Sequence, residues 1–77
     1  VGEAAYINKQ LIDIVVDLER RFNVHITVKD QELNTELFTC RFKETAKINQ
    51  ILTLLKDTRK LDYKIQGDHI QIYKPIK

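Results

Sequence analysis

The sequence contains no serine, methionine or tryptophan, and it has only two glycines, one proline and one cysteine in 77 residues. Without serine there is no serine nucleophile, so a serine hydrolase is excluded. Gly2 and Gly67 alone cannot form a glycine-rich phosphate loop or a dinucleotide fingerprint. A single cysteine, Cys40, cannot close an intramolecular disulfide or supply a cysteine-rich zinc site. Several classes of enzyme and nucleotide-binding protein are therefore ruled out.

Long apolar segments are also missing. No apolar run approaches the about 18 residues that a membrane-spanning helix needs, and no signal-like segment opens the chain. The chain begins with Val1 rather than Met, so we expect it to be a fragment of a larger, membrane-anchored protein. Its length suits one small folded domain, which we predict over residues 1–77.

The net charge of +2 is too small to drive general binding to nucleic acid or membranes, but the charge is unevenly distributed. Residues 1–38 carry four bases against seven acids, and residues 39–77 carry nine bases against four acids. A mixed, solvated surface explains this arrangement, and orientation of a protein partner is the alternative.

Apolar spacing predicts two helices. The first spans residues 8–22, with an apolar face of Leu11, Ile14, Val15, Leu18 and Phe22. We expect Asn8 to cap it, Ile7 to pack on Ile12, and Asn23 to end it in a left-handed conformation. The second begins at a Thr45 cap, continues to about Arg59, and has an apolar face of Ile48, Ile51, Leu52 and Leu55.

Alternating patterns predict strands over residues 24–29, 37–42, 61–65 and 70–73, and residues 30–35 are expected to form a polar loop. A two-residue Gly67-Asp68 turn pairs Gln66 with His69. This register places Ile65 opposite Ile70 and Tyr63 opposite Ile72, so that the four apolar side chains share one face.

An internal repeat becomes visible when the sequence is shifted by 37 residues. Seven apolar positions then coincide, from Leu11 with Ile48 through Val28 with Ile65. We predict an α+β fold of two β-α-β repeats, over about 5–29 and 37–66, followed by a final strand over about 69–74.

Several segments carry a resemblance to a known family: Leu18-Glu19-Arg20-Arg21-Phe22-Asn23-Val24, Phe38-Thr39-Cys40-Arg41-Phe42-Lys43, the Ile48–Leu55 face, and the closing segment from Leu61 to Ile72. Together they resemble the C-terminal periplasmic domain of FecR-like anti-sigma factors, which is similar in turn to the secretin and TonB N-terminal signalling domain. The resemblance covers residues 6–73, and it implies two helices that lie side by side, covered by small β-sheets.

This resemblance implies a periplasmic domain of a single-pass inner-membrane regulator. It would bind the signalling domain of a TonB-dependent outer-membrane transducer and help to control an extracytoplasmic-function sigma factor, held by a cytoplasmic part outside this sequence. A further alternative is the signalling domain of a transducer or secretin itself. No cofactor is implied, and we expect no contact of this fragment with nucleic acid or membrane.

The residues that could carry chemistry have simpler interpretations. His25 and His69 lie at polar strand positions without a third ligand at a suitable spacing, so we interpret them as surface histidines. Cys40 shares its phase with Phe38 and Phe42, which predicts a small buried side chain rather than a reactive thiolate. Asp13 and Asp17 are interpreted as solvated charges on a helix. We therefore predict no catalytic or metal site and no enzymatic activity.

An RNA-recognition motif is the main rival, because it has the same β-α-β-β-α-β order and uses aromatic residues on its third strand. Phe38 and Phe42 occupy that strand, but the glycines that accompany such aromatics are missing. A chain this short also needs both phenylalanines for its core.

Short strands that do not close into a barrel leave sheet edges with unpaired backbone groups, to which a partner strand can be added. The third and final strands are both expected to present a polar face beside such an edge. The candidate partner-binding residues are Thr39, Arg41 and Lys43 on one strand, and His69, Gln71 and Tyr73 on the other. We expect Arg41 and Lys43 to meet acidic residues of the partner.

Overall fold

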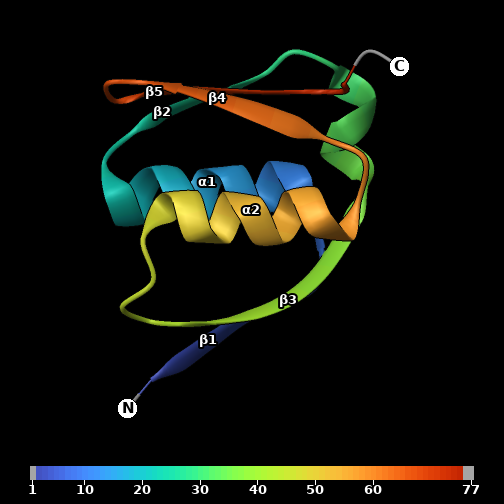
Figure 1. Ribbon diagram of the computed structural model, residues 1–77. Coiled ribbons are helices and arrows are strands. Elements are labelled where there is room, and N and C mark those ends of the chain that lie inside the picture. The colour runs from blue at the N-terminus through green and yellow to red at the C-terminus, as the bar shows by residue number, and fades with distance from the viewer. Residues whose placement is uncertain (1, 76–77) are drawn as a thin grey trace.

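The computed structural model describes residues 2–75 and has three layers (Figure 1). Two helices, α1 (Leu11–Phe22) and α2 (Ile48–Thr58), form the middle layer. Strands β1 (Glu3–Gln10) and β3 (Leu37–Lys43) form a two-stranded antiparallel sheet on one side. On the other side lies a three-stranded sheet of β2 (His25–Val28), β5 (His69–Tyr73) and β4 (Asp62–Gln66), in that order. The predicted α+β fold is confirmed.

Apolar side chains from all three layers meet in one core. Both helices bury the faces that their spacing predicts, and Phe38 and Phe42 close the core from β3. The fully buried side chains are Phe38, Leu11, Ile14, Leu18, Ile51, Leu52, Leu55, Leu61, Ile70 and Ile72. Burial of these side chains from water is the main stabilising contribution in a domain of this size.

The two β-α-β units follow the 37-residue offset closely. α1 starts at Leu11 and α2 at Ile48, while β2 starts at His25 and β4 at Asp62. The final strand β5 has no equivalent in the first unit. It lies between β2 and β4, runs parallel to β2 and antiparallel to β4, and so joins the two units into one sheet.

The hairpin of β4 and β5 has the predicted register. Gln66 pairs with His69, Ile65 with Ile70, and Tyr63 with Ile72. Gly67 adopts a φ of 61°, the left-handed conformation that a tight two-residue turn requires and that glycine adopts without strain.

The predicted helix starts are wrong. α1 begins at Leu11 after Gln10, and Asn8 instead lies within β1 at a φ of 48°. Ile7 and Ile12 are both exposed, so they form no hydrophobic staple. α2 begins after Lys47 rather than at Thr45, and the backbone N–H of Lys47 donates to Gln50 Oε1 at 2.9 Å. The other end of α1 is as predicted, with Asn23 in the left-handed conformation.

The segment predicted as a polar loop contains a short 3₁₀ helix, η1 (Gln31–Thr35). Its Leu33 is buried and joins the core. A single apolar residue in a polar stretch carries no periodicity, which explains why the sequence pattern did not reveal this turn.

Candidate protein interface

The outer face of the two-stranded sheet carries three of the predicted partner-binding residues. Thr39, Arg41 and Lys43 are exposed and alternate along β3 with the inward-facing Phe38 and Phe42. Within the described residues, no ion pair involves Arg41 or Lys43. The strand therefore presents two cations whose charge is available to a partner.

Backbone hydrogen bonds at both ends of the β1–β3 ladder fix which way the β3 backbone points. The N–H of Glu44 donates to Gly2 O at 2.9 Å, and the N–H of Leu11 donates to Glu36 O at 3.0 Å. Because hydrogen-bonded and non-hydrogen-bonded pairs alternate in an antiparallel ladder, the backbone groups of Thr39, Arg41 and Lys43 point away from β1. These residues thus combine exposed side chains with outward backbone groups.

At both ends of β3, an outward carbonyl group already accepts a hydrogen bond. Arg59 Nε donates to Leu37 O at 2.9 Å, and Lys43 O accepts from the N–H of Ala46 at 2.8 Å. Between these contacts, no described residue bonds to the outward N–H groups of Thr39, Arg41 and Lys43. We call this stretch, residues 39–43, the β3 edge.

On each edge strand of the three-stranded sheet, a carboxylate occupies one outward backbone N–H group. On β2, the outward N–H of Ile26 donates to Glu19 Oε2 at 2.9 Å. On β4, the N–H of Tyr63 donates to Asp62 Oδ1 at 2.8 Å, and Lys56 lies 3.3 Å from the same carboxylate oxygen. The Tyr63 N–H and then Lys56 hold the pKa of Asp62 below its usual range. Charged side chains placed in this way are a common protection of edge strands against unwanted pairing.

The remaining edge, that of β1, is interrupted. The register against β3 shifts between Tyr6 and Lys9, which makes a bulge at Ile7 and Asn8. The N–H of Asn8 turns toward β3 and donates to Thr39 Oγ1 at 3.0 Å. Because a bulge twists a strand and breaks its pairing surface, β3 is left as the edge best suited to strand addition.

The second predicted set, His69, Gln71 and Tyr73, is not beside a free edge. β5 is the central strand and pairs on both sides, so that expectation is wrong. These side chains instead lie in the middle of the outer face of the three-stranded sheet. β5 is the last strand in the chain, but the order of strands along the chain does not determine their order in the sheet.

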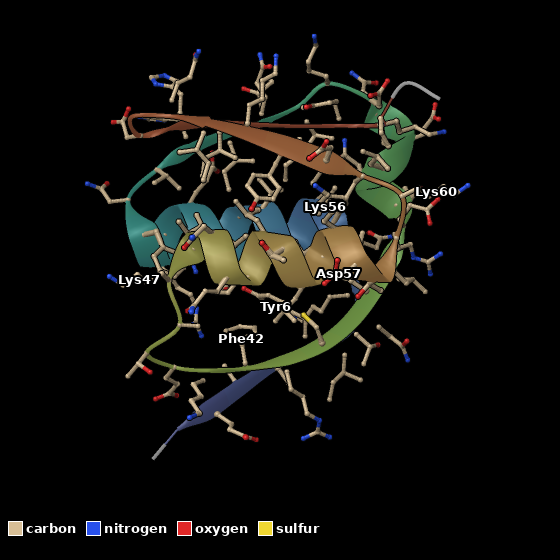
Figure 2. The ribbon with its side chains drawn as sticks, viewed as in Figure 1. Tyr6, Phe42, Lys47, Lys56, Asp57 and Lys60 are labelled. Atoms are coloured by element: carbon tan, nitrogen blue, oxygen red, sulfur yellow. The ribbon has the colours of Figure 1, made fainter. Side chains whose placement is uncertain are left out.

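A polar network supports the two-stranded sheet from within. The hydroxyl of Tyr6 donates to Asp17 Oδ2 at 2.6 Å, and Arg21 Nε donates to the same oxygen at 3.1 Å. Arg21 also lies over the ring of Phe42, which packs 5.2 Å from the Tyr6 ring, centre to centre. Figure 2 shows Tyr6 and Phe42 between the helices and the two-stranded sheet. Burial, followed by the bond to Asp17, raises the pKa of Tyr6 above its ordinary range.

Neither Cys40 nor the histidines form a catalytic arrangement. Cys40 is half-buried between Phe38 and Phe42 in β3, and this partial burial raises the pKa of its thiol, which disfavours the thiolate. His25 and His69 are exposed, as predicted. Residues 2–75 contain no group of three or more His, Cys, Asp or Glu side chains that could hold a metal ion.

Sequence reasoning missed the features that select one edge over the others. The sequence pattern gave no role to Glu19 or Asp62, and it predicted Asn8 as a helix cap. The bond from Ile26 to Glu19 joins residues seven apart across a turn, which no periodic pattern encodes. Asn tolerates both cap and left-handed positions, so Asn8 carried an ambiguous local signal.

Comparison with solved structures identifies proteins with the same fold. Two crystal structures of a putative anti-sigma factor from Parabacteroides distasonis ATCC 8503, at 1.65 and 2.50 Å, are similar to it. Each has a TM-score of 0.84 and 16% sequence identity, and each match covers 97% of this chain but 35% of the other chain. At this identity the likeness shows the fold alone, and the chain spans about a third of that protein. No curated protein matches the sequence.

The described helices are all too short or too polar to cross a membrane. A family model for the FecR C-terminal region matches residues 5–72, which is nearly the whole chain and includes both β-α-β units. The resemblance carried by the sequence motifs is therefore confirmed, and the chain belongs to the FecR C-terminal family.

Proposed function

We propose that this domain is a non-enzymatic, periplasmic signalling module of a FecR-like anti-sigma factor. It binds the signalling domain of a TonB-dependent outer-membrane transducer and so helps to control an extracytoplasmic-function sigma factor. Membership of the FecR C-terminal family supports this role. In the parent protein, one membrane-spanning helix upstream of the domain would agree with a periplasmic location.

The observation that carries the proposal is the open β3 edge. On β2 and β4 a carboxylate occupies one outward N–H group and β1 is bulged, whereas the β3 edge offers three outward N–H groups, at Thr39, Arg41 and Lys43. A partner strand could pair there with the backbone, which supplies affinity, while side chains supply selectivity. Arg41 and Lys43 favour an acidic partner strand, and they oppose pairing with the same strand of a second copy of this chain, because like charges would meet.

Calorimetric titration with the cognate transducer signalling domain tests this proposal. The double variant Arg41→Glu, Lys43→Glu should keep its fold, because surface changes usually alter stability by no more than about 0.5 kcal/mol. It should weaken binding, and the difference from the parent should shrink as salt is raised. Replacement of Lys64, in β4, and Lys29, directly after β2, by glutamate is the matched charge control. Equal affinities for parent and β3 double variant would rule this surface out.

The RNA-binding alternative loses its stacking residues in this fold. Phe38 and Phe42 are 1% and 7% exposed, and both point into the core. The strands also form two separate sheets rather than one open four-stranded platform. Titration with mixed single-stranded RNA at low salt should show no saturable binding, and micromolar affinity that falls steeply with salt would restore this alternative.

A signalling domain of a transducer or secretin, the other alternative, would share this fold. The match to the FecR C-terminal family favours the regulator over the transducer. The two differ in the parent protein, because the regulator carries a membrane-spanning helix and a cytoplasmic part, whereas a transducer continues into an outer-membrane domain.

A further inference from the structure

Two histidines from distant parts of the chain lie side by side on the outer face of the three-stranded sheet. His25 opens β2 and His69 opens β5, and the parallel register places them directly opposite each other. Their ring centres are 5.2 Å apart, and the ring planes are inclined by 30°. Both side chains are exposed, and that of His69 is 72% accessible. The pair is therefore open to a ligand from solution.

A carboxylate already orients one of the two rings. Asp68 Oδ1 lies 3.1 Å from His69 Nδ1. In metalloproteins a ligating histidine commonly donates its second ring N–H to a carboxylate, which fixes the ring and makes the other nitrogen a better ligand. The Asp68 contact therefore leaves His69 Nε2 as the coordinating atom.

The spacing of the rings matches what one metal ion requires. With a metal–nitrogen distance of about 2.1 Å, and about 1.1 Å from nitrogen to ring centre, two imidazoles on a tetrahedral ion have centres about 5 Å apart. The His25 ring need only turn about its side-chain bonds for one of its nitrogens to point at an ion held by His69 Nε2. His25 is exposed, so this rotation takes place in solvent-accessible space.

We propose that His25 and His69 form a binding site for a divalent late transition-metal ion such as Zn²⁺ or Ni²⁺. Imidazole is a preferred ligand of these ions. Residues 2–75 supply no group of three or more His, Cys, Asp or Glu ligands, so water or a side chain of a bound protein would fill the remaining positions. The ion would connect β2 to the neighbouring strand β5. Both strands belong to the three-stranded sheet, which lies on the other side of the helices from β3 (Figure 1).

This linkage has a measurable consequence, because the two histidines are adjacent only in the folded chain. An ion that binds the folded state stabilises it by mass action, by about 2.7 kcal/mol at a free concentration 100 times the dissociation constant. For a domain of this size, a stabilisation of that size raises the midpoint of thermal unfolding by on the order of 10 °C.

The test uses the tag-free 77-residue chain with Cys40→Ala, which removes the thiol as a competing ligand. ZnCl₂ and, separately, NiCl₂ are titrated by calorimetry, and thermal unfolding is followed by circular dichroism with excess metal or with EDTA. We expect one ion per chain and a higher unfolding midpoint with metal. His25→Gln and His69→Gln should each abolish both effects, and Asp68→Asn should weaken binding about tenfold or more.

Gln66→Ala is the matched control, because Gln66 pairs with His69 on the same face and is not expected to hold the ion. It should bind as the parent does. Absence of saturable binding with either metal, or binding that survives both histidine substitutions, would overturn the proposal. Because transducer binding is measured separately at the β3 edge, failure of one proposal leaves the other unaffected.

Discussion

The carboxylate of Glu19, near the end of α1, accepts the backbone hydrogen bond that Ile26 would otherwise offer at the free side of β2, with 2.9 Å between Oε2 and N. One side chain thus joins a helix to an edge strand and occupies a group that a second strand could use. On β4, Asp62 accepts a hydrogen bond from the N–H of its neighbour Tyr63. Acidic side chains thus occupy one outward N–H group on each edge strand of the three-stranded sheet, whereas the outward N–H groups of Thr39, Arg41 and Lys43 on β3 have no such partner among the described residues.

Glu19→Ala should therefore both destabilise the domain and expose β2. We expect a loss of about 1 kcal/mol, below the usual value for a charge-assisted bond because the pair is only partly buried. Glu19→Gln keeps an acceptor and should lose less. Denaturant unfolding measures the stability, and sedimentation velocity at low and high protein concentration detects self-association. If the alanine variant were as stable and as monomeric as the parent, Glu19 would have no protective role.

Leu52→Ala tests the core that the two β-α-β units share. Leu52 is fully buried, so its truncation should leave a cavity and cost about 2 to 5 kcal/mol. That is a large part of the stability of so small a domain. Asp57→Ala, on the exposed side of the same helix (Figure 2), should change the unfolding free energy by no more than about 0.5 kcal/mol. A loss below about 1 kcal/mol for Leu52→Ala would contradict its central place in the core.

How well the sequence predicted each part of the fold depends on how far apart in the sequence the interacting residues are. The β4–β5 hairpin was predicted residue by residue because the Gly67 turn and the apolar alternation select the same register. Both helix faces were also predicted, since their periodicity is local. The order of strands was not, because the placement of β5 between β2 and β4 depends on contacts between distant segments.

In the candidate interface, too, the features that depend on local sequence were predicted and those that depend on distant contacts were not. Exposure of Thr39, Arg41 and Lys43 was predicted from alternation, and it is confirmed. Whether a strand has a free edge depends on its neighbours in space, which alternation does not reveal. The prediction of a free edge beside His69 was therefore wrong. Asn8 illustrates a further limit, because its preference for helix caps and its tolerance of a left-handed φ predict different structures from one residue.

Tyr6 should make the stability of the domain sensitive to alkaline pH. Its pKa is raised by burial and by Asp17, so the folded state holds the phenolic proton more tightly than the unfolded state does. The corresponding stability is present below the unfolded-state pKa of about 10 and is lost as the pH rises beyond it. Denaturant unfolding between about pH 8 and pH 11 should show this loss, and Tyr6→Phe should reduce it. An identical alkaline slope in parent and variant would mean that Tyr6 does not contribute.

The β3 edge can be tested through its backbone as well as its charges. Arg41→Ala removes the guanidinium alone, whereas Arg41→Pro also removes an N–H that points away from β1. Proline is tolerated on edge strands where the missing N–H faces solvent, so the β1–β3 ladder should persist. If a transducer strand pairs with β3, Arg41→Pro should bind the signalling domain more weakly than Arg41→Ala. The loss should be about 0.5 to 1.5 kcal/mol, the net contribution of one backbone hydrogen bond.

Circular dichroism and denaturant unfolding first establish that both variants are folded, and calorimetry then compares their affinities. Equal affinities would show that the partner contacts side chains on this face without adding a strand to the sheet.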